Sequence, residues 1–101
     1  MVIFTRKPLE AFSRLHPPAT FPLNDWYSKT EAADWSDMSE MRQTFGSADL
    51  IGNDRFVFNI GGNKFRLIAM VHFGIRTVYV RGIFIHADYD KASKADLLNT
   101  L

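Results

Sequence analysis

At 101 residues, with a formal net charge of +1, the chain has the size of one domain, since single domains typically hold roughly 100–150 residues. Hydrophobic residues make up 47% of it, and nine phenylalanines supply bulky side chains for a core. The absence of cysteine excludes disulfide bonds, thiol catalysis and cysteine-based metal sites. We therefore expect residues 1–101 to form a single domain around one core.

The sequence also argues against membrane insertion, secretion and a zinc site. No apolar run approaches the roughly 20 residues that a membrane span requires. Residues 1–15 carry charges at Arg6, Lys7 and Glu10 and lack the long apolar run of a signal peptide. The three histidines are scattered, without HxxH or HExxH spacing. We expect a cytoplasmic protein with no membrane partner, no metal site and no cofactor.

Charge is distributed unevenly along the chain. Residues 1–51 hold five Lys and Arg against seven Asp and Glu, a balance of −2. Residues 52–91 hold six against three, a balance of +3. A basic segment is compatible with a polyanionic partner, although unequal solvated faces are the commoner explanation of so small a difference.

In chain order, the first half predicts a short strand and then helices. Residues 1–4 are apolar and suit a strand that adds to a sheet. A helix is expected over residues 8–16, capped by Thr5 and ended by the prolines at 17 and 18. A second helix is expected from Pro22 to about residue 31 or 35, with Thr20 as a nearby cap.

A third, shorter helix is expected before the chain turns to strands. Ser36 or Asp37 can cap it, and Gly46 can close it. Beyond it, residues 55–60, 64–73 and 77–85 are rich in Val, Ile, Phe and Tyr, with turn residues between them. Gly61 and Gly62 suit a two-residue hairpin turn. We expect a three-stranded antiparallel meander with the helices packed on one face, an α+β fold.

The C-terminal segment, residues 87–101, is polar and contains good helix formers. It is expected either as a loose helix or as disordered chain, with residues 92–101 as a flexible tail.

Strand alternation separates a core face from a mixed face. The apolar face contains Phe56, Phe58, Ile60, Phe65, Leu67, Ala69, Val71, Phe73, Val78, Val80, Gly82 and Phe84. The opposite face contains Arg55, Val57, Asn59, Lys64, Arg66, Ile68, Met70, Tyr79, Arg81 and Ile83. The helices should cover the apolar face.

Basic side chains gather on the mixed face. With Gly61 and Gly62 as the turn, Phe58 faces Phe65, Val57 faces Arg66 and Asn59 faces Lys64. A second turn between Gly74 and Ile75 sets Arg81 opposite Ile68 and diagonal to Arg66, roughly 7–8 Å away or less. Like charges this close repel unless an anion lies between them, so the face is compatible with a phosphate site. Solvated arginines paired with carboxylates elsewhere are the alternative, and both interpretations remain open.

His86 and Tyr89 follow the last strand, where a loop can carry them over the mixed face. Beside arginines, these side chains could transfer protons to and from a sugar hydroxyl or a leaving oxygen. A histidine that caps a turn and a tyrosine that packs its ring are the structural alternative.

Three segments together resemble the HigB family of type II toxin–antitoxin toxins, within the RelE-like superfamily. They are Asn24-Asp-Trp-Tyr27 followed by Trp35, the run RQTFGSADLIGN from Arg42 to Asn53, and the stretch from Arg55 to Tyr89 with VFNIGGNKFRL and VRGIFIHADYD. The likeness covers almost the whole chain through Lys91, in the expected order.

This resemblance implies a compact α+β endoribonuclease that cuts mRNA in the ribosomal A site without a metal, by attack of a ribose 2′-hydroxyl on the adjacent phosphodiester. It also implies a cognate helix-turn-helix, HigA-like antitoxin, through which alone the toxin would reach operator DNA. Its implied catalytic residues are Lys64, Arg66, Arg81, His86 and Tyr89. The further residues that we expect to contact RNA are Arg55, Asn59, Asn63 and Lys91.

Three positions depart from the family pattern, which commonly has lysine near Gly61, tyrosine at Phe65 and lysine at Ala87. The two missing lysines reduce the positive charge of the RNA face. The alternative function is therefore a weakened or noncatalytic module that mainly binds its antitoxin. A third is a nuclease that cuts RNA without the ribosome.

Overall fold

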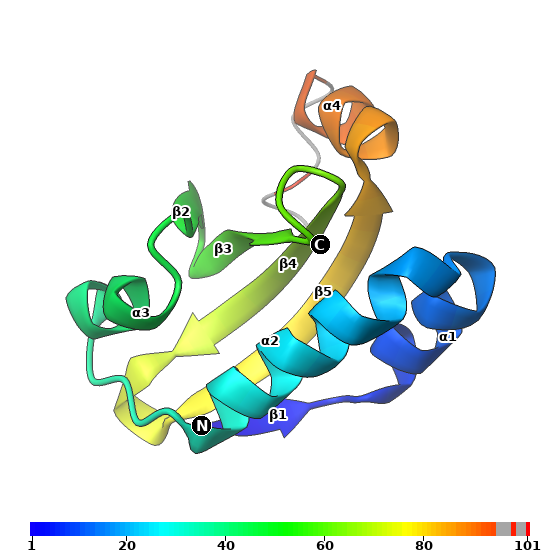
Figure 1. The fold of residues 1–101 in the computed structure, drawn as a ribbon. Helices are drawn as coiled ribbons and strands as arrows, with labels where there is room; N and C mark the ends of the chain where they lie inside the picture. The colour runs from blue at the N-terminus through cyan, green and yellow to red at the C-terminus, as the bar shows by residue number, and fades with distance from the viewer. Residues whose placement is uncertain (95–97, 99–100) are drawn as a thin grey trace.

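The chain folds as an α+β domain, which confirms the expected α+β class, although the sheet has five strands and is mixed rather than small and antiparallel. The computed structural model describes residues 1–94, 98 and 101. In chain order its elements are β1 (Val2–Phe4), α1 (Lys7–Leu15), α2 (Thr20–Ala32), α3 (Met38–Thr44), β2 (Asp49–Gly52), β3 (Arg55–Ile60), β4 (Phe65–His72), β5 (Thr77–Ile85) and α4 (His86–Lys94). Helices α1 and α2 lie across one face of the sheet, while α4 continues beyond the end of β5 (Figure 1).

The sheet is mixed and has the strand order β1-β5-β4-β3-β2. The three central strands form the antiparallel meander that the sequence predicts. The predicted N-terminal strand is confirmed as β1, which pairs parallel with β5. Strand β2 pairs antiparallel with β3 and was not expected. Its four residues are too few to show a clear alternation of apolar and polar side chains.

In the hairpin between β3 and β4, each β3 residue pairs with a β4 residue two positions later than predicted. Ile60 pairs with Phe65 and Asn59 with Arg66, so residues 61–64 form the turn. The predicted pairings of Phe58 with Phe65, Val57 with Arg66 and Asn59 with Lys64 were therefore wrong. Because side chains repeat every two residues along a strand, a shift of two left the predicted faces of β3 and β4 correct.

Strand β5 contains a β-bulge at Arg81. Val80 pairs with Ala69 and Gly82 with Ile68, so Arg81 is the extra residue and does not face Ile68 as predicted. Beyond the bulge the faces are exchanged, because one inserted residue reverses the alternation. Phe84 therefore pairs with Arg66 on the mixed face, and Ile83 joins the main core. The predicted faces of these two residues and of Gly82 were wrong.

Helices α1 and α2 begin differently from what the sequence predicts. Arg6, not Thr5, is the N-cap of α1, without a side-chain hydrogen bond. A 3₁₀ turn over Pro17–Ala19 leads into α2, so Thr20 is a helical residue rather than a cap. For α3 the prediction is confirmed, since an Asp37 carboxylate oxygen accepts from the Glu40 backbone N–H at 2.9 Å.

The main core lies between the helices and the sheet. Its fully buried members include Leu23, Trp26, Met41, Phe58 and Leu67. The ring of Phe58 makes edge contacts with Trp26 and Phe45, with ring centroids 5.5 and 5.4 Å apart. None of the helices within the described residues is long and apolar enough to cross a membrane.

A second, smaller apolar cluster lies on the mixed face. Val57 and Ile68 pair across β3 and β4, and Leu98 is buried against them with 5% of its surface exposed. Of the two alternatives for the C-terminal segment, a loose helix or disordered chain, the structure has a helix through Lys94. The flexible tail predicted for residues 92–101 falls partly on residues 95–97, 99 and 100, which lie outside the described part of the chain. Leu98 therefore covers part of the mixed face, for which the sequence predicted no apolar partner.

Candidate functional site

Two arginines from different strands converge on one oxygen atom of the mixed face. Arg81 Nε donates to the main-chain oxygen of Leu101 at 2.6 Å, and Arg55 Nη2 donates to the same oxygen at 3.2 Å. Arg55 begins β3, and the bulge in β5 presents Arg81. The pair that the structure brings together is thus Arg55 and Arg81, rather than the expected Arg66 and Arg81.

These contacts do not use all the hydrogen-bond donors of Arg55. Its Nη1 donates to the Asn53 carbonyl at 2.9 Å, which orients the guanidinium across the face. Its Nε is buried and has no hydrogen-bond partner within the described residues. A buried donor without a partner costs free energy, and an additional acceptor would relieve that cost. The two arginines together can therefore bind a group with several acceptor oxygens, such as a phosphate.

Arg66 lies beside the aromatic ring of Tyr89. The guanidinium carbon of Arg66 is 5.6 Å from the centre of the Tyr89 ring, within the range of a cation–π interaction. Its Nη1 also donates to the Phe65 carbonyl at 3.2 Å. Tyr89 packs against the second apolar cluster from α4. This contact ties α4 to β4 and leaves Arg66 half-buried at the edge of the face.

The environment of Tyr89 favours its neutral phenol. Burial raises the pKa of Tyr89 above its ordinary value of 10.0, an effect that Arg66 opposes and that the Asp49 and Asp90 carboxylates reinforce. At neutral pH the hydroxyl therefore keeps its proton and can donate it. The neutral phenol can serve as a hydrogen-bond donor or general acid, and its raised pKa makes it a weaker acid than an exposed tyrosine.

We expect Tyr89 to ionise late in an alkaline titration followed by tyrosinate absorbance. The ionisation step of Tyr89 should lie above pH 10.0, and Tyr89→Phe should remove that step. Because the folded chain holds this proton more tightly than the unfolded chain, stability should fall as the pH rises through the Tyr89 pKa. Tyr27→Phe serves as the control and should keep the late step. A late step that survives in Tyr89→Phe would contradict this expectation.

His86 lies at the start of α4 and is exposed. Its Nδ1 is 3.4 Å from Asp90 Oδ2, one helical turn further on. A carboxylate at this position favours the tautomer with the proton on Nδ1, which leaves Nε2 able to accept a proton. The sequence predicts a loop here, whereas the structure has a helix that begins directly after β5.

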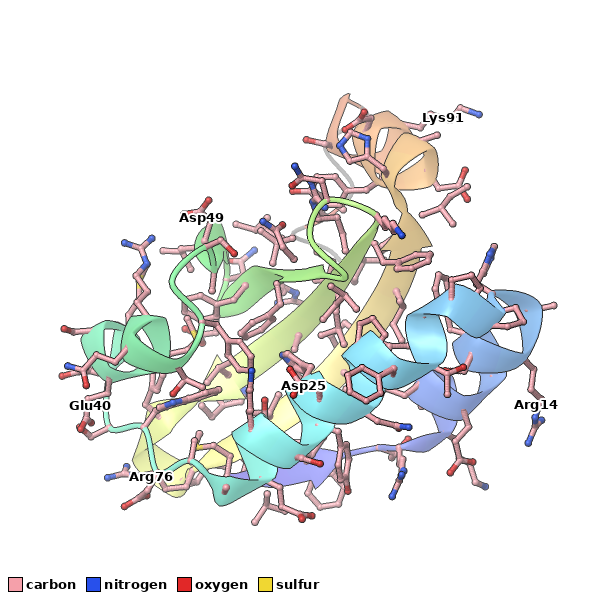
Figure 2. The ribbon with its side chains drawn as sticks, viewed as in Figure 1. Arg14, Asp25, Glu40, Asp49, Arg76 and Lys91 are labelled. Atoms are coloured by element: carbon pink, nitrogen blue, oxygen red, sulfur yellow. The ribbon has the colours of Figure 1, made fainter. Side chains whose placement is uncertain are left out.

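The remaining sequence-predicted residues lie outside the contacts that Arg55, Arg81 and Arg66 make. Asn59 is half-buried opposite Arg66, while Asn63 and Lys64 are exposed in the turn between β3 and β4. Lys91 projects from α4 into solvent (Figure 2). Lys64 and Lys91 thus supply positive charge at the periphery of the face rather than contacts with the arginines.

Sequence reasoning missed the acidic and apolar partners of the site. Asp90 was passed over because a single carboxylate in a polar tail gives no signal of its pairing with His86. Leu98 and Leu101 were the detectable signal, since two leucines at helical spacing in a polar segment indicate an apolar contact. Among residues 1–94, 98 and 101, no three His, Asp or Glu side chains group as potential metal ligands.

Comparisons with known proteins point to one family. Residues 19–92 match the family model HigB_toxin, described as the RelE-like toxic component of a toxin–antitoxin system. The chain is 32% identical over 96 residues to the mRNA interferase HigB of Escherichia coli O6:H1, covering 93% of each chain. It is also 46% identical over 35 residues to the mRNA interferase toxin HigB of Escherichia coli K12, covering 35% of this chain and 34% of that protein.

Proposed function

Because this chain belongs to the HigB family, the RelE-like toxic component of toxin–antitoxin systems, we propose that it is an mRNA interferase that cleaves translated mRNA. The convergence of Arg55 and Arg81 on one oxygen is the observation that carries the proposal. It supports binding of an RNA phosphate on the face of the sheet that α1 and α2 leave uncovered.

The arginines would act on the scissile phosphate. Arg55 and Arg81 approach from two strands and have N–H donors in a fixed planar arrangement that matches phosphate oxygens. Donors held in place before the reaction stabilise the charge that grows on the nonbridging oxygens in the transition state. Arg66 and the peripheral Lys64 would add to this positive field, and Asn59, Asn63 and Lys91 would contact neighbouring nucleotides.

His86 and Tyr89 would move the protons. In the proposed step, a 2′-hydroxyl attacks the adjacent phosphorus atom while His86 Nε2 takes its proton. The bond from phosphorus to the 5′-oxygen breaks, and Tyr89 donates a proton to that oxygen. The products are a 2′,3′-cyclic phosphate and a 5′-hydroxyl end. No metal is required, because the attacking hydroxyl is already held beside the phosphate.

Membership of the HigB family supports a proposal for the partners. We propose that the toxin acts in the cytoplasm on mRNA in the ribosomal A site, where the ribosome helps to hold the message in line for attack. A cognate helix-turn-helix antitoxin would neutralise it and mediate any contact with operator DNA.

One observation also favours a second candidate function. Arg55 and Arg81 already bind a main-chain oxygen of protein, so the same donors could bind an antitoxin segment without any catalysis. In this alternative the fold is retained as an antitoxin-binding module. Binding of antitoxin is common to both candidates, whereas cleavage of mRNA separates them.

The test is to induce the wild-type chain in a bacterial host and to map new mRNA ends. We expect growth to stop and new 5′-hydroxyl ends to occur within translated messages. In a purified translation system, cleavage should require ribosomes.

Other products would be diagnostic. Ends that carry 5′-phosphate would indicate attack by water and overturn the proposed step. Cleavage of naked RNA at the same rate would remove the ribosome from the proposal. Intact mRNA and normal growth with a soluble, folded protein would favour the noncatalytic module.

A further inference from the structure

The main-chain oxygen of Leu101 occupies the position where the proposed function requires an RNA phosphate. The main-chain oxygen of Leu101 accepts from both Arg55 and Arg81, the two residues proposed to hold the scissile phosphate. Arg81 Nε cannot donate to this oxygen and to a phosphate oxygen in the same geometry. RNA and the Leu101 main-chain oxygen therefore compete for Arg81 Nε and Arg55 Nη2.

Apolar contacts hold Leu98 and Leu101 against the sheet. Leu98 is buried against Val57 and Ile68, and the Leu101 side chain joins the same cluster. A β-carbon added at Gly82 would lie 3.6 Å from Leu101 Cδ1 and 3.0 Å from the Phe84 ring. Glycine at this position thus leaves space beside the bulge that Leu101 and Phe84 fill.

The same contacts leave the arginines incompletely satisfied. Arg55 Nε remains a buried donor without a hydrogen-bond partner within the described residues. One oxygen atom offers fewer acceptor sites than the several oxygens of a phosphate group. The Leu101 oxygen is therefore a partial substitute for the anion, one that a better ligand can displace.

We propose that Leu98 and Leu101 form an autoinhibitory contact, in which the buried Leu98 side chain holds the Leu101 main-chain oxygen on Arg55 and Arg81, and that this oxygen must leave before RNA binds. This inference rests on the proposed function, because it assumes that RNA phosphate binds these arginines. A closed segment reduces the apparent affinity for RNA by the fraction of molecules that are open. Weakening the Leu98 anchor should therefore strengthen RNA binding.

The experiment uses the full-length chain with Leu98→Ser and a fluorescent 2′-O-methyl oligoribonucleotide, which lacks the attacking hydroxyl and is not cleaved. We expect Leu98→Ser to bind this probe about tenfold more tightly than the wild type, by anisotropy, because one leucine's burial holds the segment closed. Leu15→Ser is the matched control, since Leu15 is 78% exposed on α1. It should leave the affinity unchanged.

A second measurement needs no variant. In the wild-type protein, methyl NMR contacts from Leu98 to Val57 and Ile68 should be present without the probe and lost at saturation. A purely structural role for Leu98 would lower the stability of Leu98→Ser without increasing its affinity. Leu98 contacts that persist in the wild-type complex would overturn the inference, as would affinity in Leu98→Ser no tighter than in Leu15→Ser.

These outcomes are separable from failure of the proposed function. If the wild type cleaves translated mRNA while Leu98 remains in contact with Ile68, the autoinhibitory contact is wrong and the nuclease stands. If neither wild type nor Leu98→Ser binds the probe or cleaves mRNA, the proposed function fails and the inference fails with it.

Discussion

Replacing Arg81 with alanine is expected to abolish toxicity and to reduce mRNA cleavage by about 10²–10³-fold, the usual effect of removing one donor that stabilises transition-state charge. The bulge in β5 places Arg81 beside Arg55, and its Nε makes the shorter of the two contacts with the shared oxygen, 2.6 Å against 3.2 Å. Single-turnover cleavage of ribosome-bound mRNA by the purified proteins measures the loss directly.

The fold should survive this change, because the Arg81 side chain is exposed and belongs to neither apolar cluster. Circular dichroism should therefore be that of the wild type. Arg81→Lys should not restore activity, since an ammonium group cannot reproduce the planar donors of a guanidinium. Arg14→Ala is the matched control, on the outer side of α1 (Figure 2). If Arg81→Ala cleaves as the wild type does, the two-arginine phosphate site is wrong.

Phe58→Ala is expected to cause the largest loss of stability, about 3–5 kcal/mol. Phe58 is 1% exposed, and its ring lies between Trp26 of α2 and Phe45 after α3. Truncation leaves a cavity where these elements meet β3, and neither ring can fill it without losing its own contacts. Since small domains are stable by about 5–15 kcal/mol in total, the variant should lie close to unfolding. Urea denaturation followed by tryptophan fluorescence measures the change.

The control is the same substitution at an exposed phenylalanine. Phe21 is 82% exposed at the start of α2, so Phe21→Ala should change the free energy of unfolding by about 0.5 kcal/mol or less. An equal loss of stability in the two variants would contradict the position of the core between the helices and the sheet.

Much of the fold was predictable from local signals. The apolar alternation in β3 and β4 identified their buried faces, and Asp37 marked the start of α3 through its hydrogen bond to Glu40. Gly61 and Gly62 were correctly assigned to a turn with positive φ, at 62° and 70°. These features succeeded because each depends on neighbouring residues and on the period of its own element.

The candidate site was predictable only in part. Arg81 and Arg66 were named from the sequence, but their supposed proximity assumed an unbroken strand. The bulge at Arg81 changed its partner, and Gly82 was the available signal, since glycine within a strand often marks such an irregularity. The pairing of Arg81 with Arg55 depends on how strands far apart in sequence align, which alternation alone does not determine.

Composition, strand period and turn residues were sufficient to determine an α+β domain with a helix-covered apolar face and arginines on the other face. Only the tertiary structure decided which arginines share a ligand, and that the C-terminal leucines meet them. The physical reason is the range of each interaction. Alternation and capping act between near neighbours, whereas the contact of Leu101 with Arg55 joins residues 46 positions apart. Such a contact forms only after the sheet is assembled.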